Sequence, residues 1–131
     1  TFMRKRSLTP LGETEMEVLH HVWELGEATV ADVRERILEE RTVAYTTIMT
    51  VMKNLAEKGY LQYRKEGVAY VYSPARSANE VRQSLLGDLI RKVFKGSPHS
   101  LVQALVEQED LSAQDLDEIR SMIDQMKDRD D

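Results

Sequence analysis

The chain has 131 residues, of which 41% are hydrophobic and 31% are charged, and it carries a net charge of −5 without any cysteine. This composition indicates one globular domain, or a compact domain with an appended helical part, and the lack of cysteine excludes disulfides and thiolate metal sites. No apolar run approaches the ~18 residues that a membrane span needs, and no signal-peptide pattern is present, so we expect a cytoplasmic protein without a membrane partner.

Three helices are predicted in the first part of the chain. The first starts at Thr9-Pro10, because proline is favoured at the first helical position, and ends at Gly26. The second follows Thr29, whose side chain can cap a helix, and the third runs from about 44 to 58, with Gly59 after its end. Apolar residues at three- and four-residue steps predict one buried face for each helix. These residues are Met16, Leu19, Val22 and Trp23, then Val30, Val33 and Ile37, then Ile48, Val51, Met52 and Leu55.

The hydrophobic period then changes from that of a helix to that of a strand. Residues 60–64 (YLQYR) alternate between apolar and polar, 65–67 (KEG) predict a turn, and 68–73 (VAYVYS) are rich in β-branched and aromatic residues before Pro74. This pattern predicts a two-stranded hairpin. Three short helices followed by a hairpin is the order of a winged helix-turn-helix domain, which we predict over residues 1–76.

A helical region is predicted over residues 77–131, so the whole chain is expected to be mainly α with a small β hairpin. Capping patterns begin helices at Ser77, Ser97 and Ser112. Their apolar stripes are wider than three helices alone would easily cover, which favours burial against a second copy of the chain. The alternative is that these helices fold back on their own winged domain. The predicted dimerisation residues are Val81, Leu85, Leu89, Val93, Leu101, Leu105, Leu116, Ile119 and Ile123.

Charge is distributed unevenly along the chain. Residues 77–131 hold 7 basic and 12 acidic residues and account for the whole net charge, whereas residues 1–76 hold 11 of each. Residues 41–76 contain six basic residues against two acidic ones, a local excess of +4. Because local charge attracts phosphate, the acidic total does not exclude a nucleic-acid partner.

Several polar residues of the predicted third helix lie outside its apolar stripe. They are Thr46, Thr47, Thr50, Lys53 and Asn54. Threonine is a mediocre helix former, so helix preference does not explain three of them together. Their hydroxyl, methyl and amide groups can contact base edges, and Arg64 and Lys65 near the predicted hairpin tip can reach flanking phosphates or the minor groove. Each feature alone fits an ordinary solvated surface, but together they predict binding to double-stranded DNA.

Three segments carry a resemblance to a known family: LTPLGETEMEVLHHVWELGEATVADV, YTTIMTVMKNLAEKGYLQYRKEGVAYVYSP and SLVQALVEQEDLS. From Leu8 to about Met126 the chain resembles the penicillinase repressor family, the BlaI/MecI/CopY-type winged-helix regulators. The resemblance implies a homodimeric transcriptional repressor of the antibiotic-resistance type, which binds a palindromic operator until a signal relieves repression. By position it places recognition contacts at Thr46, Thr47, Thr50 and Asn54, and wing contacts at Arg64 and Lys65. Family members often carry lysine at the first of these positions and arginine at the fourth.

Two departures from the family concern regulation. In the β-lactam-responsive branch, a signal-activated protease cuts an Asn-Phe bond in the C-terminal region, and the matching pair here is Ala104-Leu105. That cleavage rule therefore does not transfer directly. The copper-responsive branch uses a C-terminal cysteine cluster, and the lack of cysteine in this chain excludes copper sensing by that route.

The sequence does not indicate enzyme chemistry, a metal or a cofactor. His20 and His21 are adjacent on a helix and point about 100° apart, so they are poor joint metal ligands. His99 lies between Ser97 and Ser100 without the context of a nucleophile elbow. Two alternatives to a repressor are a winged-helix module for protein–protein contact, in which the threonine face meets a partner protein, and a hydrolase using His99, for which we find no nucleophile.

Overall fold

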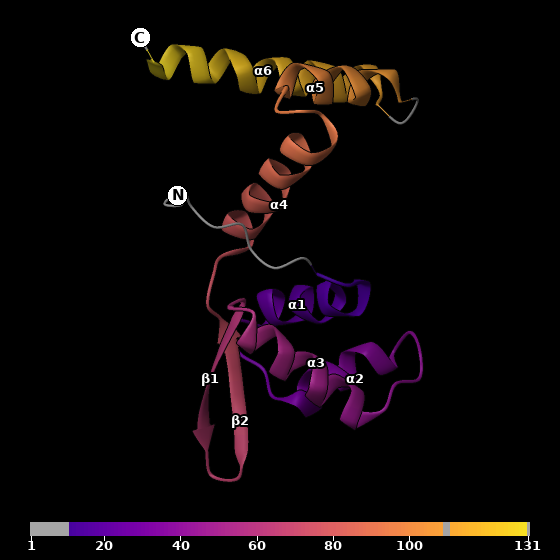
Figure 1. Cartoon of the computed structure of the whole chain (residues 1–131), viewed down its shortest axis with the longest axis vertical. Coiled ribbons are helices and arrows are strands. Elements are labelled where there is room, and N and C mark those ends of the chain that lie inside the picture. The colour runs from indigo at the N-terminus through magenta and orange to yellow at the C-terminus, as the bar shows by residue number, and fades with distance from the viewer. Residues whose placement is uncertain (1–10, 109–110, 131) are drawn as a thin grey trace. The chain divides into compact units, whose positions relative to one another are not determined.

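The structure of the chain is a computed structural model that describes residues 11–108 and 111–130. The elements follow in the order α1 (Glu13–Leu25), α2 (Val30–Leu38), α3 (Tyr45–Glu57), β1 (Leu61–Glu66), β2 (Ala69–Pro74), α4 (Ala78–Val93), α5 (Pro98–Glu107) and α6 (Ala113–Asp130) (Figure 1). The mainly α fold with a small hairpin agrees with the prediction. Thr9 and Pro10 lie outside the described residues, but the predicted helix start there is wrong, because α1 begins at Glu13 and Gly12 before it has an extended backbone. The chain divides into two compact units, one ending at Gly87 and the other beginning at Asp88.

The predicted helix caps are present. Thr29 Oγ1 accepts a hydrogen bond from the Asp32 N–H at 3.1 Å, and the Asp32 carboxylate accepts one from the Thr29 N–H at 3.0 Å. The same reciprocal bonds join Ser77 with Glu80 and Ser112 with Asp115. Ser97 caps α5, whose first residue is Pro98. These bonds satisfy first-turn N–H groups that have no partner within the helix, so the capping residues fix where each helix begins.

The hairpin is tighter than predicted. β1 and β2 are antiparallel and pair from Leu61 opposite Pro74 to Glu66 opposite Ala69. The turn therefore consists of residues 67–68, and not of 65–67 as the sequence pattern indicated. Gly67 has a φ of 61°, which glycine adopts without a steric penalty, and this conformation allows a two-residue turn. As a result, residues 64 and 65 lie within a strand and not at the tip.

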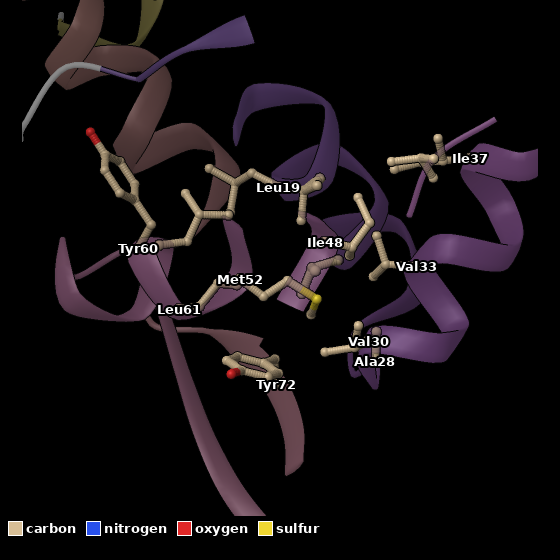
Figure 2. Close-up of a cluster of buried hydrophobic side chains, with 14 of the residues drawn as sticks. Leu19, Ala28, Val30, Val33, Ile37, Ile48, Met52, Tyr60, Leu61 and Tyr72 are labelled. Atoms are coloured by element: carbon tan, nitrogen blue, oxygen red, sulfur yellow. The ribbon is translucent and has the colours of Figure 1, made fainter. Parts of the chain in front are cut away.

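The core of the first unit joins the apolar faces of α1, α2 and α3 to the base of the hairpin, with their side chains directed inward (Figure 2). The predicted buried faces are confirmed for most positions. Met16, Trp23 and Val51 differ, since they are half-buried at the edge of the core. From the hairpin, Leu61 and Tyr72 close the core. Ala28 exchanges backbone hydrogen bonds of 2.9 and 2.8 Å with Tyr72, so the segment between α1 and α2 holds β2 in place.

The start of α4 belongs to this first core. Val81 is fully buried there, and Leu85 packs against it. A side chain buried in its own chain cannot form a surface for a second copy, so we remove Val81 from the dimerisation residues. The division of the chain into residues 1–76 and 77–131 stays a prediction.

The second unit leaves its apolar side chains accessible. Among the described residues after Val81, no hydrophobic side chain is buried, and Val93, Val102, Val106 and Met122 are more than half exposed. Single exposed apolar residues are ordinary, but here they recur along both α5 and α6. No helix in the described ranges combines the length and apolar character that crossing a membrane requires.

Candidate nucleic-acid interface

α3 has one apolar face and one polar face. Ile48, Met52 and Leu55 are fully buried and hold the helix to the core. The five polar residues singled out in the sequence are all exposed: Thr46, Thr47, Thr50, Lys53 and Asn54. The residue before the helix is Ala44, whose side chain offers no acceptor to the first-turn N–H groups. Because only the apolar face holds the helix to the core, the polar face can contact a ligand without any change in how the helix packs.

Two further residues of α3 are exposed on the same helix but were not predicted as site residues. Tyr45 is 47% exposed and Met49 is 43% exposed. Met49 falls outside the spacing of the buried residues 48, 52 and 55, whereas Tyr45 fits that spacing and is exposed all the same. The exposed surface of α3 is therefore less purely polar than the threonines suggested.

Arg64 is held by two carboxylates. Its Nη1 donates to Glu27 Oε2 at 2.6 Å, and its Nε donates to Glu66 Oε2 at 2.7 Å. The hydrogen bonds to Glu27 and Glu66 raise the pKa of the Arg64 guanidinium, and Arg64 in turn lowers the pKa of the Glu27 carboxyl. Lys65 is exposed and makes no ion pair within the described part of the chain. Neighbouring strand residues point to opposite faces, so the hairpin separates the two cations that the sequence placed together.

Most other basic side chains in residues 41–76 also lie close to a carboxylate. Arg41 is 2.5 Å from Glu17, and Lys58 is 2.8 Å from Glu15. Arg76 lies 3.9 Å from Glu80. Of the six basic residues in this segment, only the lysines at 53 and 65 have no carboxylate within 4.0 Å among the described residues. The positive charge available to a phosphate is therefore smaller than the sequence count indicated.

A cluster of tyrosines lies on one face of the hairpin. The ring of Tyr63 lies edge-on to that of Tyr70, with centroids 5.4 Å apart, and 5.5 Å from that of Tyr72. Burial raises the pKa of the Tyr72 phenol, and the nearby phenols of Tyr63, Tyr70 and Tyr45 raise it further. The sequence pattern did not indicate this cluster, because its members come from both strands and meet only when the hairpin pairs.

The remaining residues considered in the sequence are the three histidines and the pair Ala104-Leu105. The His20 ring packs edge-on to Trp23 with centroids 5.3 Å apart, and His21 Nδ1 lies 4.0 Å from Glu24. His99 is exposed on α5. In the described ranges, no three His, Asp or Glu side chains are close enough to hold a metal ion. Ala104 is half-buried in α5, and Leu105 beside it is 43% exposed.

Three packed helices, an exposed polar face on the third and an adjoining hairpin define a winged helix-turn-helix module, a class of protein that reads DNA. The profile of the penicillinase repressor family matches residues 11–125. This chain belongs to that family, whose members are transcriptional regulators.

Individual relatives agree with this assignment. The chain is 28% identical over 113 residues to the methicillin resistance regulatory protein MecI of Mammaliicoccus sciuri, covering 86% of this chain and 92% of MecI. It is 36% identical over 84 residues to the transcriptional regulator BlaI of Mycobacterium tuberculosis, covering 63% and 61%. The solution structure of the DNA binding domain of the repressor BlaI matches with a TM-score of 0.51 at 25% identity, over 58% of this chain and 93% of that domain. The similarity to known regulators therefore includes both the winged unit and, for MecI, the helices that follow it.

Proposed function

We propose that this chain is a sequence-specific transcriptional repressor that binds double-stranded operator DNA as a homodimer. The observation that carries the proposal is the division of α3, which buries Ile48, Met52 and Leu55 and exposes the threonine face. The similarity to the DNA binding domain of the repressor BlaI supports it.

The exposed groups of α3 match the chemistry of a major groove. A threonine hydroxyl can donate to or accept from a base edge, and its methyl group can contact the methyl group of thymine. The Asn54 amide can pair with adenine, and Lys53 can contact a phosphate. The threonines at 46, 47 and 50 occupy the N-terminal half of α3, which is the half that enters the groove in helix-turn-helix proteins.

The accessible apolar stripes of the second unit support a homodimer. The exposed members of the proposed interface are Leu89, Val93, Leu105, Leu116, Ile119 and Ile123. Leu85 and Leu101 are half-buried and complete the proposed set. A two-fold dimer would present two α3 helices to half-sites separated by about one turn of DNA, roughly 10 base pairs, which is why we expect a palindromic operator.

We also propose that a signal relieves repression, and that one route is proteolysis in the C-terminal region by a signal-activated protease. The candidate bond between Ala104 and Leu105 lies inside α5, which spans Pro98–Glu107. A helical peptide bond does not fit a site that binds an extended chain, so α5 must unwind locally before it can be cut. Mass spectrometry of the chain recovered from derepressed cells tests this route. A fragment ending at residue 104 is expected, and an intact chain in derepressed cells would contradict it.

Selection of duplexes from a random pool by the purified full-length chain tests the function itself. The parent should enrich a palindrome, and Thr47→Ala should relax the preference at one position of each half-site, where a good base contact discriminates by ~1–3 kcal/mol. Lys53→Gln is the matched control on the same face, because loss of a phosphate contact weakens all sequences alike. A parent chain that enriches no sequence would contradict the proposal and favour the alternative, a module for protein–protein contact.

A further inference from the structure

The two faces of the β hairpin differ in the groups that they carry. Tyr63 pairs directly with Tyr72, and Lys65 pairs with Tyr70, so these four side chains share one face. Arg64, one residue from Lys65 along β1, is on the opposite face. Only one of these faces can be turned toward a DNA backbone that runs beside α3.

The Arg64 face is unfavourable for phosphate. It holds one guanidinium and two carboxylates, those of Glu27 and Glu66, so its net charge is −1. All three groups are about half exposed. A phosphate approaching Arg64 would have to break these ion pairs and would meet both carboxylates at close range, where like charges repel. Arg64 instead links the hairpin to the segment before α2, since Glu27 immediately precedes Ala28, which is bonded to Tyr72.

The opposite face is suited to phosphate. It carries the ammonium of Lys65 without a nearby carboxylate, together with the exposed phenols of Tyr63 and Tyr70. Mutual ring packing fixes these tyrosines, and so their hydroxyl groups can donate hydrogen bonds from nearly preset positions. Leu61 and Tyr72 lie on the same face and pack into the core together with Met52 of α3 (Figure 2). This face of the hairpin is therefore turned toward α3.

We propose that the operator backbone lies against the tyrosine face, which consists of Tyr63, Tyr70 and Lys65, and that Arg64 is a positioning residue that does not touch DNA. This inference rests on the proposed function. On this face two exposed phenol donors accompany a single cation, Lys65, and most other basic side chains around α3 are paired with carboxylates. The expected consequence is a binding affinity that depends less steeply on salt than the basic count of the sequence indicates, because neutral donors release no counterions.

The salt dependence of binding separates the two faces. A labelled duplex selected by the parent chain is titrated with full-length variants at several salt concentrations. Lys65→Gln removes one phosphate contact per half-site, so it should weaken binding about tenfold or more and reduce the magnitude of the log–log salt slope by about 2 for a dimer. Arg64→Gln should leave the slope at the parent value. The proposal is overturned if Arg64→Gln reduces the slope and Lys65→Gln does not.

Conservative variants test the role of each face. The double variant Tyr63→Phe, Tyr70→Phe keeps the ring packing and removes only the hydroxyls, so binding should weaken about fivefold or more with an unchanged slope, as expected for lost neutral hydrogen bonds. Arg64→Lys keeps the charge but cannot bond both carboxylates with one planar group, so it should weaken binding as much as Arg64→Gln does. Binding at the parent level by the phenylalanine variant, or full rescue by Arg64→Lys, would overturn the proposal. If the parent chain selects no duplex, the proposed function fails together with this inference. If the parent selects a duplex but the variants behave in the contrary way, only the assignment of the wing face is overturned.

Discussion

Replacing Ile119 by Asp tests the proposed dimer surface on α6. Ile119 is 42% exposed and shares a helical stripe with Leu116 and Ile123. Full burial of an isoleucine side chain contributes ~1.5–3 kcal/mol, so covering the exposed part contributes about 1 kcal/mol per chain. A two-fold dimer counts each interface residue twice, so the substitution removes about 2 kcal/mol of apolar burial.

The aspartate adds a second cost, because its carboxylate would lose water against an apolar surface without gaining a partner. An unsatisfied polar group costs ~1–3 kcal/mol, and the dimer contains two of them. The total is at least about 4 kcal/mol, which corresponds to a roughly 1,000-fold higher dissociation constant for the dimer. A dimer that dissociates at nanomolar concentration would then dissociate at micromolar concentration.

Sedimentation velocity over a range of concentrations measures this change. The matched control is Ser121→Asp, which adds the same charge two residues further along α6, where the side chain points about 200° away from that of Ile119. We expect the control to dimerise like the parent, and Ile119→Asp to be monomeric at concentrations where both are dimers. The reasoning is refuted if Ile119→Asp dimerises as tightly as Ser121→Asp.

Two other predictions concern the stability of the winged unit. Met52→Ala should lower the free energy of unfolding by ~2–5 kcal/mol because Met52 is fully buried, whereas Met49→Ala on the exposed side of the same helix should change it by less than about 1 kcal/mol. Urea denaturation followed by the fluorescence of Trp23, the only tryptophan, measures both, and equal effects would contradict the burial of α3. Burial raises the pKa of Glu15, but the Gly12 N–H and the Lys58 ammonium outweigh it, so the pKa is lowered below its ordinary value of 4.5. The stabilisation from Glu15 is therefore complete above pH 4.5 and is lost as the pH falls through the lowered value, so Glu15→Gln should destabilise the chain at pH 7 and have little effect at the acid end of that range. A stability difference between parent and Glu15→Gln that does not change with pH would contradict this ion pair.

The helices, most of their ends and the class of fold could be predicted from the sequence because each depends on residues that are close in the chain. A cap such as Thr29 with Asp32 forms within one helical turn, and the buried stripe of α3 follows from its 3.6-residue period. The hairpin was recognised from its alternation, although its turn was placed too early. The exposed threonine face followed directly, since the residues that are not buried on a packed helix must face outward.

Contacts between residues that are far apart in the chain, and the pairing of their charges, could not be predicted from the sequence. From the sequence, Arg64 and Lys65 were predicted to act alike as cations that contact DNA. In the folded chain, Glu27, 37 positions away, forms an ion pair with Arg64, whereas Lys65 lies on the same face as the tyrosines. Similarly, Val81 has the spacing of an interface residue, yet it completes the core of the winged unit. The spacing of apolar and polar residues in the sequence shows which side chains share one face of a helix or strand. Which partner covers that face, and whether a charge on it is already neutralised, depends on contacts that form only when separate elements pack together.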